Sequence, residues 1–181
     1  MKAMVREKYG SPDVFKLKEV KKPVPQDDQL LIKVQAASIN ASDWEMLVGK
    51  PFYVRASGGM IKPKTTILGS DIAGYVEAVG KDVQQFQPGD AVFCDLIWRG
   101  SGGFAEYVCA RESVMTLKPK EMTFAEAAAV PQAGVLALQG LRDKRVVIPG
   151  HKVLINGAGG GTGTFALQIA KMFGAEVTGV D

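Results

Sequence analysis

Residues 152–181 read KVLINGAGGGTGTFALQIAKMFGAEVTGVD, and this stretch decides the fold of the C-terminal part of the chain. An apolar run over 152–156 leads directly into a glycine-rich segment, 157–163. Apolar residues recur at helical spacing over 164–173, and a second apolar run follows over 176–180. The order strand, glycine loop, helix and strand predicts the βαβ unit that begins a dinucleotide-binding domain.

The glycine loop has the chemistry that a pyrophosphate group requires. Anionic phosphates must come close to backbone amides, and glycines permit this because they lack a Cβ and tolerate the positive φ of a tight turn. The start of the following helix adds free N–H groups and a partial positive charge. A glycine-rich turn between packed elements is the alternative. We predict that the cofactor is held by Gly157, Ala158, Gly159, Gly160, Gly161, Thr162 and Gly163.

Asp181 stands at the carboxyl end of the second predicted strand, 18 residues after Gly163. An acid about 20 residues beyond the glycines can accept hydrogen bonds from the hydroxyls of an adenosine ribose. The flanking strand, the amphipathic helix and this acid make the motif more specific than its glycines alone. We predict the ribose role for Asp181, and a solvated terminal residue is the alternative.

The first ~120 residues predict short strands separated by turns, as in a barrel or sandwich, rather than a βαβ array. Alternating or apolar runs predict strands over 14–20, 29–37, 72–79, 91–95 and 104–109. Ser42 is a candidate N-cap for a short helix over 43–48, which Gly49 ends. The glycines and prolines of 49–65 predict a long loop.

The composition changes near Met122. Thr123 and Glu126 have the spacing of a capping box, and an alanine-rich helix is expected to run to about Val130. A second helix is expected over Gln132–Arg142. We therefore place a domain boundary between residues 122 and 123.

Composition and charge argue against several classes of protein. The net charge of +3 is too small to indicate nucleic-acid binding, and no apolar run approaches the ~20 residues that span a bilayer. The N-terminus lacks the apolar core of a signal peptide, so a cytoplasmic protein is expected. Cys94 and Cys109 form no metal-binding pair, and His151 is the one histidine, so a zinc site is not expected.

Four stretches carry a resemblance to a known family over essentially the whole chain. They are Ala36–Trp44, Leu68–Gly80 with Pro88-Gly89-Asp90, Gly103–Val108, and Ala127–Gly134 leading to the glycine loop. The chain resembles the N-terminal portion of the medium-chain dehydrogenase/reductase superfamily, most closely its zinc-independent quinone oxidoreductase (zeta-crystallin-like) branch. The resemblance implies an α/β protein: a GroES-like β-barrel domain over 1–122, followed by an incomplete Rossmann NAD(P)-binding domain over 123–181.

The resemblance also bears on metal binding. Zinc-dependent relatives have a cysteine ligand where this chain has Asn40 and a histidine–glutamate pair at Ser70-Asp71, and no cysteine lies near Gln132. No zinc is therefore expected to polarise a carbonyl substrate. Hydride transfer to a quinone, an enone or a similar carbonyl compound needs less help, because charge spreads through the conjugated system. Hydrogen-bond donors can supply the rest.

The resemblance suggests which side chains would act on such a small-molecule substrate. Asn40 is the expected donor, and a buried amide that satisfies loop backbone is the alternative. Asp43 would orient Asn40 or cap the short helix, and the capping role is favoured. Trp44 and Tyr53 would form an aromatic substrate pocket, with plain packing the alternative for Trp44.

Two departures from the family leave the cofactor and the activity open. Relatives commonly use NADPH, whereas the carboxylate of Asp181 would repel a 2′-phosphate and favours NADH. A full dinucleotide domain usually has six parallel strands, of which two are present here. The expected function is an NAD(P)H-dependent, zinc-independent oxidoreductase. The alternative is a catalytically incomplete fragment that binds a cofactor or a partner. The resemblance leaves a homodimer open.

Overall fold

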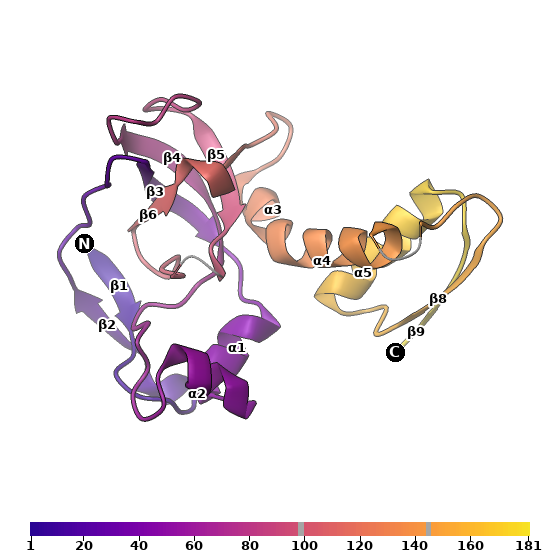
Figure 1. Ribbon diagram of the computed structural model, residues 1–181, viewed down its shortest axis with the longest axis horizontal. Coiled ribbons are helices and arrows are strands. Elements are labelled where there is room, and N and C mark those ends of the chain that lie inside the picture. The colour runs from indigo at the N-terminus through magenta and orange to yellow at the C-terminus, as the bar shows by residue number, and fades with distance from the viewer. Residues whose placement is uncertain (98–99, 144–145) are drawn as a thin grey trace. The chain divides into compact units, whose positions relative to one another are not determined.

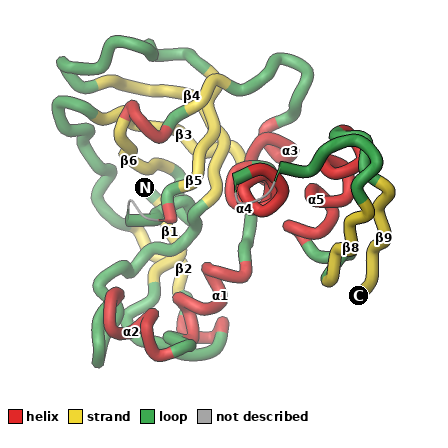
Figure 2. Tube along the Cα trace, turned by 45° about the vertical axis from the view of Figure 1, so that its right-hand side comes forward, coloured by secondary structure: helices red, strands yellow, loops and turns green. Residues whose placement is uncertain are grey.

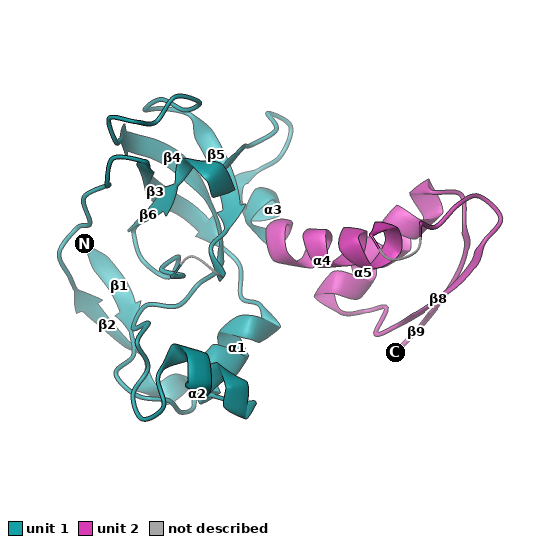
Figure 3. Cartoon of the chain, in the orientation of Figure 1, with its two compact units in different colours: residues 1–129 teal, residues 130–181 magenta. Residues whose placement is uncertain are grey.

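The computed structural model describes residues 1–97, 100–143 and 146–181. Their contacts form two compact units, 1–129 and 130–181, which are described separately (Figure 3). The division falls later than the composition shift at Met122 predicts. Helix α3 (Phe124–Ala129) belongs to the first unit because its Ala127 and Ala128 are buried with Ala73. The roles assigned to the two domains stay a prediction.

Unit 1 is built on a five-stranded antiparallel sheet with the strand order β6-β3-β4-β5-β7 (Figure 1). Its strands are β3 (Gln29–Ala37), β4 (Asp71–Val79), β5 (Ala91–Asp95), β6 (Tyr107–Arg111) and β7 (Thr116–Leu117). A second antiparallel pair joins β1 (Lys2–Val5) to β2 (Lys16–Glu19). The connections include the short 3-10 turns η1 (Pro12–Val14) and η3 (Glu112–Val114).

The larger buried cluster of unit 1 lies on one face of this sheet. Alternate residues of β3 and β4 point inward, and Leu30, Ile32 and Ile72 are completely buried. Strands β3 and β5 have the bounds that the sequence predicts. Strand β6 begins at Tyr107, later than expected, and β1 and β7 were not expected at all.

Two helices lie together at one end of unit 1 in both ribbon and tube views (Figures 1 and 2). Helix α1 (Ala41–Val48) ends as predicted at Gly49, whose φ is +67°. Its N-cap is Asn40, so the prediction of Ser42 as the cap was wrong. Helix α2 (Phe52–Gly58) lies where a loop was predicted. A proline with its fixed φ is compatible with a helix start, and here Pro51 is the N-cap.

Unit 2 contains the βαβ unit that the opening stretch predicts. Strands β8 (Lys152–Asn156) and β9 (Glu176–Val180) pair in parallel, and α5 (Gly161–Met172) connects them. Helix α4 (Pro131–Arg142) packs against α5 through buried alanines. The predicted fold class is confirmed: an α/β chain with a GroES-like part followed by a Rossmann-type unit. Within the described residues, no helix has the length and apolar character needed to cross a bilayer.

Candidate functional site

The glycine loop of unit 2 is tied to the end of β9. The amides of Gly157 and Ala158 both donate to the carbonyl of Val180, at 2.8 and 3.0 Å. Gly157 has a φ of +78°, a conformation that residues with a side chain rarely adopt. The tight turn at the start of the loop therefore requires glycine, as the sequence predicts.

Gly163 is required for a different reason. A Cβ at this position would lie 2.0 Å from the carbonyl oxygen of Gly157, which is far inside van der Waals contact. A Cβ on Gly161 would lie 3.9 Å from the Cβ of Ala133, with no closer neighbour. Gly163 thus allows the first turn of α5 to lie against the loop, whereas Gly161 has room for a side chain.

Three amides at the start of α5 are the best placed to bind an anion. Gly161, Thr162 and Gly163 form the first turn of the helix, where amides have no intrahelical acceptor. The positive end of the helix dipole lies at the same place. The Gly160 amide is engaged with the carbonyl of Gly157 at 3.1 Å. A close backbone approach and free first-turn amides fit the pyrophosphate of a dinucleotide cofactor.

Asp181 lies beside this loop. Its Oδ1 accepts a hydrogen bond from the amide of Gly159 at 2.9 Å, so the end of β9 returns to the glycines. The sequence predicts this acid at the edge of the cofactor seat but does not predict its bond to the loop. Its role toward a ribose stays a prediction.

A second polar cluster lies in unit 1, at the start of α1. Oδ2 of Asp43 accepts the amide of Asn40 at 2.9 Å, and Oδ1 accepts the amide of Gly69 at 3.1 Å. Burial raises the pKa of the Asp43 carboxyl, while the amides of Asn40, Gly69 and Ser70 act to lower it and the charge of Asp95 raises it. Asp43 therefore caps α1 and joins it to the segment before β4.

The amide side chain of Asn40 contacts two serines. Its Nδ2 donates to the hydroxyls of Ser38 at 3.2 Å and Ser70 at 3.3 Å. Ser70 is completely buried, whereas Ser38 and Asn40 are half-buried. Sequence reasoning missed Ser38, although its position two residues before Asn40 was a usable signal. To donate to a substrate, Asn40 must exchange one of these two long bonds.

Ser70 is followed by buried Asp71, which pairs with Asp95 across β4 and β5. Burial, together with the charges of these two aspartates, raises the pKa of the Cys94 thiol far above its ordinary value. Cys109 is half-buried rather than fully buried. Among the described residues, no group of three or more histidine, cysteine, aspartate or glutamate side chains could hold a metal ion.

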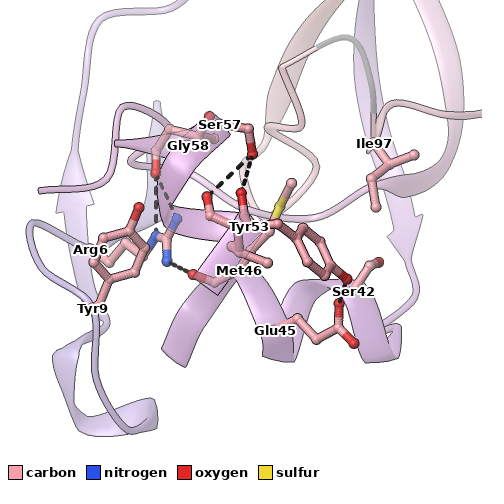
Figure 4. Close-up of a pocket in the computed structure, with 11 residues that line it drawn as sticks. Arg6, Tyr9, Ser42, Glu45, Met46, Tyr53, Ser57, Gly58 and Ile97 are labelled. Carbon is pink, nitrogen blue, oxygen red and sulfur yellow. Dashed lines mark hydrogen bonds between the residues drawn. The ribbon is translucent and has the colours of Figure 1, made fainter. Parts of the chain in front are cut away.

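A cavity of about 170 Å³ opens beside α1 and α2 (Figure 4). Arg6 and Tyr9 line one side, and Tyr53 and Glu45 line the other. The Tyr53 hydroxyl donates to Oε2 of Glu45 at 3.2 Å, and this carboxylate raises the pKa of the phenol. The cavity thus combines mostly apolar walls with a phenol and a carboxylate at its edge.

The four residues predicted for substrate chemistry are only partly brought together. Asn40 and Asp43 are in direct contact. Tyr53 lines the cavity, whereas neither Trp44 nor Asn40 is among the described residues that line it. Trp44 is 53% exposed, so it is not a core residue. The functional roles of all four stay predictions.

The buried guanidinium of Arg6 holds the cavity wall. It donates to the carbonyls of Thr65 and of Met46 in α1. Tyr9 lies between Arg6 and Arg55, whose guanidinium carbons are 5.2 and 4.6 Å from its ring centre. These contacts attach both helices to the N-terminal segment, and no motif in the sequence predicts them.

Comparison with known proteins places these features in a family. Residues 26–120 match the model of the alcohol dehydrogenase GroES-like domain. The chain is similar to the quinone oxidoreductase of Sus scrofa, with 38% identity over 95% of this chain and 50% of that protein. It is similar to the 2-methylene-furan-3-one reductase of Solanum lycopersicum, with 39% identity over 97% of this chain and 46% of that protein. The chain thus spans about half the length of these relatives.

A solved structure is similar over nearly the whole chain. The quinone oxidoreductase of Coxiella burnetii aligns with a TM-score of 0.90 and 36% sequence identity. The alignment covers 99% of this chain and 56% of that one.

Proposed function

We propose a function from the family to which the chain belongs, the alcohol dehydrogenase GroES-like family, in the quinone oxidoreductase branch of the medium-chain dehydrogenase/reductase superfamily. The chain acts as part of an NAD(P)H-dependent reductase. The proposed reaction is hydride transfer to a quinone, an enone or a similar carbonyl compound, without zinc. The observation that carries the proposal is the glycine cradle of unit 2, in which a Cβ on Gly163 would meet a backbone carbonyl at 2.0 Å.

The cofactor end of the proposal rests on unit 2. The first-turn amides of Gly161, Thr162 and Gly163 would hold the pyrophosphate, and the Asp181 carboxylate would accept the ribose hydroxyls. A bound reduced nicotinamide supplies the hydride. We propose NADH rather than NADPH, because a carboxylate beside the ribose repels a 2′-phosphate.

The substrate end rests on the polar cluster of unit 1. Where zinc-dependent relatives have metal ligands, this chain has an amide and a hydroxyl that already bond each other, Asn40 and Ser70. The half-buried Asn40 and Ser38 would supply hydrogen-bond donors to a substrate oxygen as negative charge develops there, whereas the completely buried Ser70 accepts from Asn40 and would orient its amide. Asp43 would fix the Asn40 backbone and thereby the direction of its side chain. This chemistry suits a conjugated acceptor, in which the charge is already delocalised.

A hydride-transfer assay tests this function. The full chain would be mixed with NADH or NADPH and with p-benzoquinone or methyl vinyl ketone, and loss of the reduced-nicotinamide absorbance would be followed. We expect turnover with NADH in preference to NADPH. Asn40→Ala should lower kcat/KM by roughly a hundredfold, the usual cost of losing one donor to a developing oxyanion. Absence of turnover with both cofactors, by chain shown to be folded, overturns the enzymatic proposal.

A cofactor-binding module without turnover is the second candidate. The observation that favours it is that the glycine loop and the Asp181 carboxylate lie together within unit 2. Quenching of NADH fluorescence without oxidation would support this module. A homodimer, which the resemblance leaves open, and the expected cytoplasmic location stay proposals, to be tested by sedimentation and by cell fractionation.

A further inference from the structure

The Asp181 carboxylate fills the space beside the second glycine of the loop. Its Oδ1 lies 2.9 Å from the amide nitrogen of Gly159. A Cβ built on Gly159 would lie 2.4 Å from Oδ2 of the same carboxylate. Any side chain at position 159 would therefore displace Asp181 from its present place.

The other loop amides have different acceptors. Those of Gly157 and Ala158 donate to Val180, and that of Gly160 donates to Gly157. The first-turn amides of α5 therefore remain available to bind the phosphates. Among residues 157–160, the Gly159 amide is therefore the one that donates to the carboxylate. The sequence alone assigned this glycine to the pyrophosphate along with its neighbours.

We propose that Gly159 is a positioning residue for Asp181 and sets the preference for a 2′-hydroxyl over a 2′-phosphate on the cofactor's adenosine ribose. This inference rests on the proposed function. The hydrogen bond from the Gly159 amide to Oδ1 fixes one oxygen of the Asp181 carboxylate and leaves Oδ2 to accept the ribose hydroxyls. The fixed negative charge then repels a 2′-phosphate more effectively than a freely rotating carboxylate would.

Calorimetric titration of the full chain with ADP-ribose and with 2′-phospho-ADP-ribose tests the proposal without requiring turnover. The wild-type chain should prefer ADP-ribose. Gly159→Ala should weaken ADP-ribose binding about tenfold, the usual value of a hydrogen bond to a charged group, and should abolish most of the preference. In an Asp181→Ala background, Gly159→Ala should cause no further change in the preference.

Gly160→Ala is the matched control in the same loop. Its Cβ would lie 3.4 Å from the carbonyl of Gly157 and would not meet Asp181. We expect this variant to change the affinities for the two ligands by the same factor, so that their ratio stays at the wild-type value.

The outcomes separate the inference from the function beneath it. If Gly159→Ala weakens both ligands equally, and does so again without Asp181, its Cβ acts on the phosphates and the inference is overturned while the function stands. If the folded wild-type chain binds neither ligand, the proposed function fails and the inference fails with it.

A measurement on the cofactor-free chain guards against a variant that does not fold. Amide hydrogen exchange at Gly159 should speed up in Asp181→Ala, because the amide loses its acceptor. Unchanged protection of the Gly159 amide would show that the bond does not hold the carboxylate in solution, and would overturn the inference.

Discussion

The buried carboxylate of Asp43 accepts a hydrogen bond from the backbone amide of Gly69 at 3.1 Å, and so joins α1 to the segment before β4. The other oxygen of the same carboxylate accepts the amide of Asn40. One side chain thus fixes the backbone on both sides of the Asn40–Ser70 contact, which is the centre of the polar cluster in unit 1.

Asp43→Asn should destabilise the chain. The substitution keeps the shape of the side chain but replaces one acceptor oxygen with an NH2 group, which leaves a buried backbone amide without an acceptor. We expect a loss of about 1–3 kcal/mol in the free energy of unfolding, measured in urea. Asp82→Asn, at an exposed position, is the control and should resemble the wild type. Equal effects of the two substitutions would contradict the capping role.

The stability difference between the wild type and Asp43→Asn should depend on pH. Burial raises the pKa of Asp43 above its value in the unfolded chain. Its stabilising contribution is therefore complete below the unfolded pKa of about 4 and is lost as the pH rises through the folded pKa. Urea unfolding at a series of pH values should show the stability gap between wild type and Asp43→Asn narrowing as pH rises. A gap that widens with pH would show that the pKa is lowered instead.

The sequence predicted the parts of the fold that depend on local pattern. The glycine spacing and the apolar face after it were enough to order β8, α5 and β9. The contacts that place α2 are long-range: Tyr9 packs against Arg55 and donates to the carbonyl of Gly59 at 2.7 Å. A helix of seven residues has little intrinsic stability, so the formation of α2 depends on those tertiary contacts.

The candidate site shows the same limit. Asn40 and Ser42 are both good N-cap residues, and local preference could not choose between them. In the structure the helix begins after Asn40, and Asp43 in its first turn accepts a hydrogen bond from the amide of Gly69, 26 positions away. Ser70 meets Asn40 because β3 and β4 pair, which no short motif encodes.

Gly163 and Gly161 should respond differently to alanine. In Gly163→Ala the new methyl would overlap the carbonyl of Gly157, so we expect a lower melting temperature and a loss of about 2 kcal/mol or more. In Gly161→Ala the methyl has room, and alanine is the better helix former, so stability should be unchanged or higher. Thermal unfolding followed by circular dichroism measures both variants. A tolerated Gly163→Ala would contradict the close approach of helix and loop.

Ser101 combines two unfavourable features that glycine would remove. Its φ is +54°, and its buried hydroxyl has no hydrogen-bond partner among the described residues. Ser101→Gly should stabilise the chain by about 1 kcal/mol in urea unfolding. Ser101→Ala, which removes only the hydroxyl and keeps the backbone strain, should gain less. A stabilising alanine together with a destabilising glycine would reverse this expectation.

The glycine loop of unit 2 is proposed to bind a nicotinamide dinucleotide. Titration of the nitrogen-15-labelled chain with NADH, followed by amide chemical shifts, tests it residue by residue and without turnover. We predict saturable shift changes that are largest at the amides of Gly161, Thr162 and Gly163, with smaller changes at Gly159 and Asp181. Saturable changes confined to unit 1, or none in the glycine loop of the folded chain, would contradict the claim.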